Sequence, residues 1–125
     1  LVGALGGNDV LRCRDPGAAR AYLDRILNAA GAQAVPVFLV AILAPRNYGP
    51  EYKQTWDEMF PALSAAYGTG FHPGFFTEFE SEDPAEFQIL LQGDGIHPNP
   101  EGVRQIVDGF GPDLSAWLKA RFGLS

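Results

Sequence analysis

Residues 93–99 place a carboxylate and an imidazole close together, because Asp94 and His97 are three positions apart in a glycine-containing stretch ahead of a predicted helix. A carboxylate that accepts a hydrogen bond from His Nδ1–H fixes the tautomer, leaves Nε2 free to take a proton and stabilises the resulting imidazolium. The pair therefore has the chemistry of a general base with its orienting acid. The alternative is that Asp94 caps a turn and His97 is an exposed loop residue.

A second polar group, Asn8, follows the first predicted strand within the stretch Gly6–Asp9. A side-chain amide held at a strand end can donate a hydrogen bond to a developing oxyanion, a contact worth roughly 2.7–4 kcal/mol. Asn8 is therefore the candidate oxyanion donor. The alternative is an Asx turn or a left-handed backbone position, which Asn and Gly both tolerate. Asp9 is expected to cap or to bond locally.

The segments that must position these groups alternate between strand and helix patterns. Residues 1–5 form a continuous apolar run, which predicts a strand buried on both faces and ending in a tight loop. Residues 15–31 open on an Asp-Pro pair and carry apolar residues at helical spacing, so a helix is predicted there. A second buried strand is predicted over 35–43, and an amphipathic helix over 51–68.

The second half of the chain continues the alternation less regularly. Residues 71–76 predict a short third strand, and the proline within it favours an edge position. Residues 81–92 suggest a short helix or a lid-like excursion. A last helix is predicted to start at Asn99, to break or kink between residues 109 and 112, and then to continue to Phe122.

Alternating strands and helices predict an α/β fold in which helices sandwich a parallel sheet, with the site at the carboxyl ends of the strands. Asn8 follows that rule, because it comes directly after the first strand. The chain has 125 residues and a mass of 13.5 kDa, which allows one domain. We find no internal repeat and no low-complexity linker in the sequence.

The composition excludes several classes of function. The net charge is −6, and the nine Lys and Arg residues are scattered, so the chain has no electrostatic footprint for nucleic acid or anionic lipid. The longest apolar stretch, Val35–Ala44, is well short of the roughly 20 residues that span a bilayer. The single Cys13 offers neither an intrachain disulfide nor a CxxC zinc pair.

Two motifs resemble a known family in content and order. Leu5–Asp9 (LGGND) resembles block III of the SGNH, or GDSL, hydrolases, and Asp94–Asn99 (DGIHPN) resembles block V. The spacing and the intervening loop Pro45–Gly49 (PRNYG) are especially similar to the bacterial thioesterase I, lysophospholipase and arylesterase subgroup. The resemblance spans essentially the whole chain.

This resemblance implies a three-layer α/β/α flavodoxin-like fold and hydrolysis of carboxylic or thio esters by a Ser-His-Asp triad. By position it makes His97 the general base, Asp94 its orienting acid and Asn8 the side-chain oxyanion donor. It also implies that Asn47 and Tyr48 contact the substrate, where the alternative is a plain helix-leading turn. The implied partner is a small-molecule acyl ester or thioester, no metal or organic cofactor is needed, and the implied location is periplasmic or secreted.

The family also has a GDS serine and a glycine of the oxyanion hole, which would both precede Leu1. Residues 1–125 are therefore expected to be the C-terminal two-thirds of an SGNH hydrolase domain, with the first strands missing. We expect the isolated chain to hydrolyse esters negligibly, and the strand at Leu1 to present an open apolar edge that promotes aggregation. The oligomeric state stays open.

The other nucleophile candidates within the chain are weak. No G-x-S-x-G elbow or GDS-like loop presents any of the serines, which are Ser64, Ser81, Ser115 and Ser125. Cys13 lies between Arg12 and Arg14 and is interpreted as an ordinary thiol rather than a reactive one. His72, beside Pro73, is interpreted as structural.

Two other functions stay open from the sequence. One is a non-catalytic α/β binding module that uses the same loops as ligand contacts, and the other is a carbohydrate esterase on the same scaffold. Labelling by a fluorophosphonate probe separates the first from an ester hydrolase. A preference for acetylated sugars over acyl thioesters separates the second.

Overall fold

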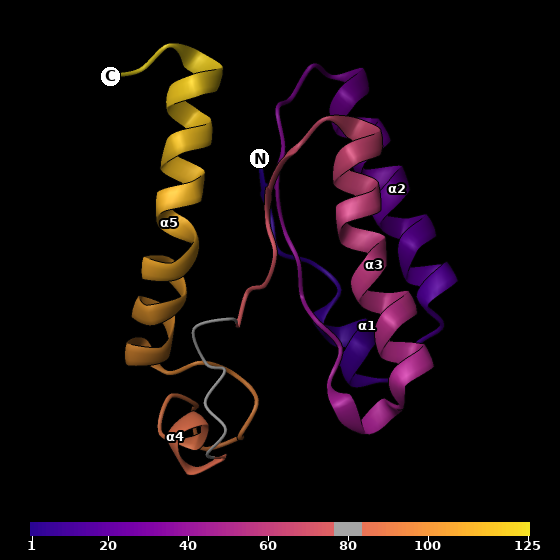
Figure 1. The fold of residues 1–125 in the computed structure, drawn as a ribbon, viewed down its shortest axis with the longest axis vertical. Coiled ribbons are helices and arrows are strands. Elements are labelled where there is room, and N and C mark those ends of the chain that lie inside the picture. The colour runs from indigo at the N-terminus through magenta and orange to yellow at the C-terminus, as the bar shows by residue number, and fades with distance from the viewer. Residues whose placement is uncertain (77–83) are drawn as a thin grey trace.

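Three short parallel strands form the sheet of this protein. The computed structural model describes residues 1–76 and 84–125 (Figure 1). The strand order is β1 (Val2–Gly3), β2 (Phe38–Val40) and β3 (Gly70–His72). All pairs are parallel, with Val2 opposite Phe38 and Phe38 opposite Gly70. The predicted parallel sheet is therefore confirmed.

Helices cover both faces of the sheet and make three layers. Helices α2 (Pro16–Ala32) and α3 (Pro50–Tyr67) lie together on one face, and α5 (Pro100–Phe122) lies on the other (Figure 1). Two short helices, α1 (Gly7–Leu11) and α4 (Pro84–Gln88), and a 3-10 turn η1 (Arg46–Tyr48) complete the described elements. The predicted α/β/α architecture is confirmed.

The main apolar core lies between the sheet and the α2–α3 layer. Helix α2 starts where Asp15 accepts a hydrogen bond from Ala18 N at 2.9 Å, as its Asp-Pro pair predicts. Leu23 and Leu27 on α2 face Trp56 and Phe60 on α3 within one buried cluster, and both aromatic side chains are 0% exposed. Aromatic side chains of this size each remove about 150–250 Å² from water, so they dominate the stability of this layer.

The strands are shorter than predicted, and the buried stretches are shorter too. Val35 is 41% exposed, and Leu1, Val2 and Leu5 of the first predicted strand are 45–58% exposed, so the prediction that this strand is buried on both faces is wrong. Residues 37–42 are all buried, but only residues 38–40 of that run pair as a strand. Single backbone hydrogen bonds continue beyond the strand, from Leu1 N to Pro36 O and from Ala41 N to His72 O. Pro36 has no N–H to donate, however, and the neighbouring strands β1 and β3 have only two and three residues. The third strand, predicted over 71–76, stops at His72 because Pro73 follows it.

Helix α5 runs from Pro100 to Phe122 with Pro112 inside it, so of the predicted break or kink between residues 109 and 112, the break is wrong. A proline removes one backbone hydrogen bond, but tertiary contacts hold the helix on both sides of it. Phe110 packs against His72 at a ring distance of 6.2 Å, and Trp117 packs against Phe38 at 5.6 Å. The helix start at Asn99 is confirmed, because its side chain accepts a hydrogen bond from Gly102 N at 2.9 Å.

The predicted excursion over 81–92 is described only in part. Residues 84–88 form α4, and residues 81–83 lie outside the described ranges. Leu90 packs with Ile106 of α5 in a second, smaller apolar cluster. This cluster attaches the segment before the candidate site to α5.

Candidate active site

Asp94 and His97 are in direct contact. His97 Nδ1 lies 2.6 Å from Asp94 Oδ2, and the other carboxylate oxygen accepts hydrogen bonds from Ile96 N at 2.9 Å and His97 N at 3.0 Å. The carboxylate thus shapes the turn and holds the imidazole with its two oxygens. The structure shows that the two interpretations of this motif, a turn cap and an acid–imidazole pair, are both realised by the same side chain.

The electrostatics of this pair determine where the proton lies. Hydrogen bonds from the His97 side chain, His97 N and Ile96 N lower the pKa of Asp94 from its ordinary 3.8 to about 2. Asp94 is therefore a carboxylate at neutral pH and can only accept hydrogen bonds. The proton in the 2.6 Å contact belongs to Nδ1 of His97, so a neutral imidazole carries its lone pair on Nε2. The imidazole is 68% exposed, which leaves it open to an incoming group.

The backbone around this loop is held from the helix that follows. Asn99, the N-cap of α5, donates from Nδ2 to Ile89 O at 2.7 Å and to Leu91 O at 3.2 Å. Gln92 N donates to His97 O at 2.7 Å, which closes the loop on itself. The Asn99 side chain therefore caps α5 and also holds the main chain of residues 89–91, ahead of Asp94. These hydrogen bonds fix the backbone of the loop that carries His97, although the His97 side chain itself is exposed.

Asn8 does not lie on a loop, as the sequence suggested, but in the five-residue helix α1. Gly6 precedes it with φ of 106°, a left-handed geometry that glycine adopts without cost. The Asn8 side chain is exposed. Asp9 accepts a local hydrogen bond through its main-chain oxygen from Arg14 N at 2.9 Å.

The loop after β2 carries Asn47 and Tyr48 in the turn η1. Lys53 and Asp57 anchor the start of this loop, because Lys53 Nζ donates to Ala44 O at 2.7 Å and Asp57 accepts from Ala44 N at 2.8 Å. Asn47 is exposed and Tyr48 is half-buried. Whether either residue contacts a substrate stays a prediction.

Helix α1, which carries Asn8, the turn η1 and the loop 94–97 all lie at the end of the molecule toward which the carboxyl ends of the strands point (Figure 1). This is the end at which parallel α/β sheets bind their ligands. The structure brings Asp94 and His97 into contact. Among the described residues, Asn8, Asn47 and Tyr48 share no hydrogen bond with His97.

A second imidazole–carboxylate pair was not predicted from the sequence. His72 Nδ1 lies 2.7 Å from Asp113 Oδ2, and the His72 side chain is only 9% exposed. Its partners are 41 positions apart, so no local spacing could have revealed the pair. His72 lies on β3, and its side chain is enclosed against α5. This burial agrees with the structural role expected for it.

The described serines do not share the position of the Asp94–His97 pair. Ser64 Oγ accepts a hydrogen bond from Thr69 Oγ1 at 2.8 Å and lies just ahead of β3, at the amino ends of the strands. Ser115 is exposed on α5, and Ser125 is exposed after it. Ser81 lies outside the described residues.

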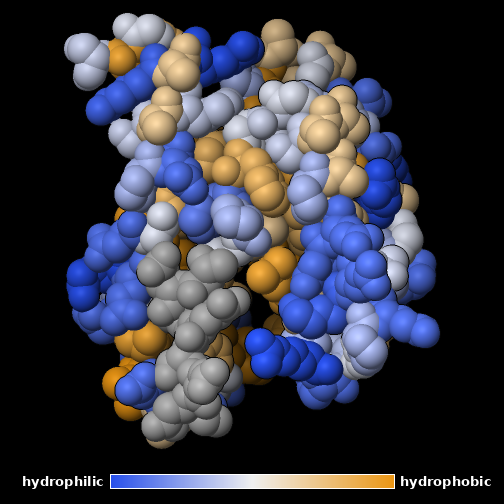
Figure 2. All heavy atoms as spheres, viewed as in Figure 1, coloured by the Kyte–Doolittle hydropathy of each residue, from blue (hydrophilic) through white to orange (hydrophobic). Residues whose placement is uncertain are grey.

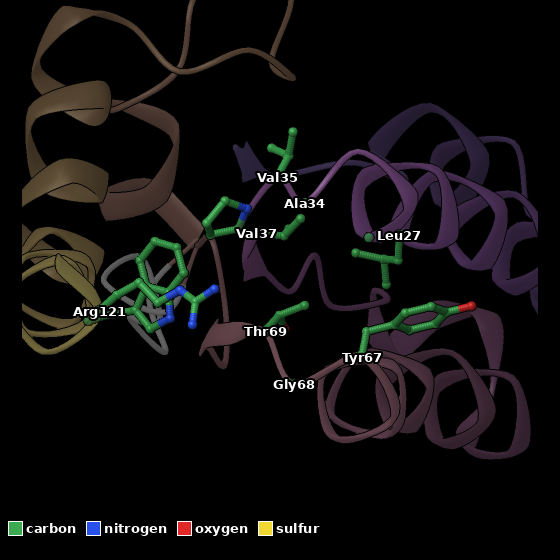
Figure 3. A pocket seen from close by; sticks show the side chains of 11 residues that line it. Leu27, Ala34, Val35, Val37, Tyr67, Gly68, Thr69 and Arg121 are labelled. Carbon is green, nitrogen blue, oxygen red and sulfur yellow. The ribbon is translucent and has the colours of Figure 1, made fainter.

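A pocket of about 270 Å³ opens beside the amino ends of β2 and β3 (Figure 3). Leu27, Val35 and Tyr67 line one side of it, and Trp117 and Arg121 of α5 line the other. Figure 2 shows apolar atoms in the middle of this face of the molecule, between polar flanks. None of the predicted site residues lines this pocket, so it is separate from the candidate site.

The described ranges 1–76 and 84–125 hold neither a metal-binding cluster nor a membrane-spanning helix. No three His, Cys, Asp or Glu side chains within them gather closely enough to hold a metal ion. No helix within them combines the length and apolar character needed to cross a membrane.

The chain belongs to the GDSL-like lipase/acylhydrolase family, whose sequence model matches residues 1–105. It is 32% identical over 118 residues to the esterase TesA of Pseudomonas aeruginosa, a match that covers 94% of this chain and 56% of that protein. It is 31% identical over 110 residues to the thioesterase 1/protease 1/lysophospholipase L1 of Escherichia coli, covering 88% of this chain and 50% of that protein. The chain thus spans about half the length of these relatives.

Solved structures agree with this assignment. A crystal structure of TesA superposes with a TM-score of 0.78 at 30% identity, covering 92% of this chain and 61% of that one. The psychrotrophic esterase EstA from a Pseudoalteromonas species superposes with a TM-score of 0.80 at 26% identity, covering 94% and 61%. The SGNH hydrolase fold predicted from the sequence is therefore confirmed.

Proposed function

We propose that this chain carries the general base, the orienting acid and one oxyanion donor of a serine-dependent hydrolase of carboxylic or thio esters. The observation that carries the proposal is the 2.6 Å contact between His97 Nδ1 and the ionised Asp94. That contact leaves Nε2 as the basic atom of an accessible imidazole. An imidazole in this state accepts the proton of a serine hydroxyl during attack on an acyl carbon.

The remaining steps follow from the same chemistry. His97, once protonated, is stabilised by Asp94 and returns the proton to the leaving alcohol or thiol. A water then attacks the acyl-serine with His97 again as the base, and no electron transfer or cofactor is needed. Asn8 donates its side-chain N–H to the negative oxygen of each tetrahedral intermediate. In this proposal Asn47 and Tyr48 border the acyl group, and the protein acts in the periplasm or outside the cell.

The test is hydrolysis of p-nitrophenyl acetate and butyrate by the 125-residue chain and by the longest polypeptide that its gene encodes. In an active polypeptide, we expect Asp94→Asn to lower kcat on the order of 10⁴-fold, because the imidazole loses its orienting carboxylate. Asn8→Ala is expected to lower kcat by about 10²–10³-fold. Reaction with a fluorophosphonate probe reports the serine directly.

The chain offers a matched control for the acid. Asp113 also lies beside a histidine Nδ1, at 2.7 Å rather than 2.6 Å. Asp113→Asn removes the same charge from the other pair and should leave kcat unchanged. Equal losses in the two variants would contradict the proposal, and so would the absence of both hydrolysis and probe labelling in the longest encoded polypeptide.

A further inference from the structure

The helix that carries Asn8 is too short to hold itself in place. Helix α1 has five residues, and its N-cap Gly6 offers no side-chain hydrogen bond. Isolated helices shorter than roughly 12 residues are marginal in water, so tertiary contacts must define this one. An oxyanion donor works only when its orientation is set before the reaction. The contacts around α1 therefore bear directly on the proposed role of Asn8.

Four aromatic side chains form a continuous column beside α1, and we call them the aromatic column. Tyr48 leads to Tyr52, Trp56 and Phe60, with successive ring centroids 5.5, 6.0 and 6.3 Å apart. The last three are spaced by four residues on α3, which stacks them along one face of the helix. Trp56 Nε1 also donates to Ile42 O at 2.7 Å, which locks the column to the segment after β2.

The buried end of the aromatic column packs against the start of α1. A Cβ atom placed on Gly6 would lie 3.3 Å from Trp56 Cζ2 and 3.8 Å from Phe60 Cζ, so the Gly6 backbone rests directly on these two rings. Val10, one turn further, is 4% exposed within the same core cluster. The amino-terminal end of α1 is thereby held by apolar contact.

The exposed end of the aromatic column holds the other end of α1 by hydrogen bonds. Tyr48 Oη donates to Leu11 O at 3.1 Å, and Tyr52 Oη donates to Arg14 O at 2.7 Å. Leu11 is the last residue of α1, and the last carbonyls of a helix have no partner within it, so the Tyr48 hydroxyl is well placed there. Arg14 lies beyond α1, but its N–H donates to Asp9 O of α1 at 2.9 Å, so the Tyr52 bond acts on the helix through this segment. Both bonds join residues 37 or 38 positions apart, which makes them true tertiary ties.

We propose that Tyr48 and Tyr52 are positioning residues for Asn8. Their hydroxyls fasten the carboxyl-terminal side of α1 while Trp56 and Phe60 support its amino-terminal side, so that the Asn8 amide keeps one orientation. This inference rests on the proposed function, because it assigns a purpose to the orientation of Asn8. It explains why both hydroxyl groups donate to main-chain oxygens of the segment that carries Asn8, at Leu11 and Arg14.

The experiment replaces each hydroxyl without disturbing the ring. Tyr48→Phe, Tyr52→Phe and the double variant are compared with Tyr67→Phe in the longest polypeptide that the gene encodes. Tyr67 is the control, because its hydroxyl also lies on α3 but ties α3 to α2 instead, through Asp24 Oδ1 at 2.7 Å and Asp24 O at 3.2 Å. We expect Tyr52→Phe to lower kcat with KM unchanged, since a loosened donor mainly loses transition-state stabilisation. The double variant should lower kcat by about tenfold, and its KM is not the criterion, because Tyr48 is also proposed to border the acyl group.

A second arm separates positioning from general weakening. In an Asn8→Ala background the tyrosine substitutions should lower kcat no further, because the group that they orient is gone. A tenfold loss that persists in this background would overturn the inference, and so would an equal loss in Tyr67→Phe. Unfolding in urea, measured on all variants, verifies that each is folded in the assay.

A third arm keeps the inference testable without any activity. Hydrogen exchange of the amides of Val10 in α1 and of its C-cap Arg12 is followed in the longest polypeptide that the gene encodes. Faster exchange in the double variant, with wild-type rates in Tyr67→Phe, supports the role of the column. Unchanged exchange overturns it. If wild-type polypeptide shows no hydrolysis, the proposed function fails and this arm alone decides whether the column holds α1.

Discussion

His72 Nδ1 on β3 lies 2.7 Å from Asp113 Oδ2 on α5, and this contact joins the sheet to the helix on its second face. The imidazole is almost enclosed, whereas the carboxylate is 55% exposed. Helix α5 begins directly after the loop that carries His97. The stability of the α5 layer therefore bears on the candidate site even though His72 is not part of it.

The first prediction concerns this tie. Asp113→Asn should lower the free energy of unfolding by about 1 kcal/mol, which is below the roughly 1.5–3 kcal/mol of hydrogen bonds to charged groups because solvent screens the exposed carboxylate. The measurement is urea unfolding followed by tryptophan fluorescence. Asp108→Asn is the control, since Asp108 pairs with Arg104 within α5 and does not reach the sheet. Equal changes in both variants would contradict a tie between layers.

The second prediction concerns pH. The lowered pKa of Asp94 means that its hydrogen bonds stabilise the fold above its ordinary 3.8 and that this contribution is lost as pH falls toward about 2. In His97→Ala the pKa of Asp94 should rise, because its largest cause is removed, yet stay below 3.8 because the main-chain donors remain. Carboxyl-carbon NMR measures both values. His72→Ala should leave the titration of Asp94 unchanged, and an unchanged midpoint in His97→Ala would refute this account.

The third prediction compares Gly31 of α2 with Gly102 of α5. Alanine favours a helix interior over glycine by about 0.5–1 kcal/mol. A Cβ on Gly31 meets nothing within 4 Å, so Gly31→Ala should raise the melting temperature. A Cβ on Gly102 would overlap Leu90 O and lie 3.2 Å from Pro98 Cβ. Overpacking costs about 1–3 kcal/mol and outweighs the gain, so Gly102→Ala should lower the melting temperature. Shifts of the same sign in both variants would show that the Leu90 contact is not tight.

The fourth prediction concerns the edge of the described sheet. Leu1, Val2 and Leu5 at β1 are 45–58% exposed, and they border a largely apolar groove of about 140 Å³. An exposed apolar strand edge pairs readily with another chain, so the 125-residue chain should self-associate. Val2→Lys should reduce this association in sedimentation velocity. Val107→Lys, at a similarly exposed valine on α5, should not. A wild-type chain that sediments as a monomer at all concentrations would contradict the prediction.

Much of the candidate site could be predicted because its interactions are local. Asp94 and His97 meet across three residues, and the caps at Asp15 and Asn99 act within three residues of chain. Such bonds depend on backbone turns that the residues themselves favour. Helices α2 and α3 were predicted for the same reason, since apolar periodicity is a property of a single segment.

The sequence by itself therefore determined the family resemblance, the α/β/α class and the pairing of Asp94 with His97. Only the tertiary structure decided that Asn8 lies in a helix, that α5 continues past Pro112, and that His72 meets Asp113. Each of these depends on surfaces brought together from distant parts of the chain, as when Tyr52 reaches Arg14 across 38 positions. Local propensity carries no information about such contacts, because their energy exists only once the layers have packed.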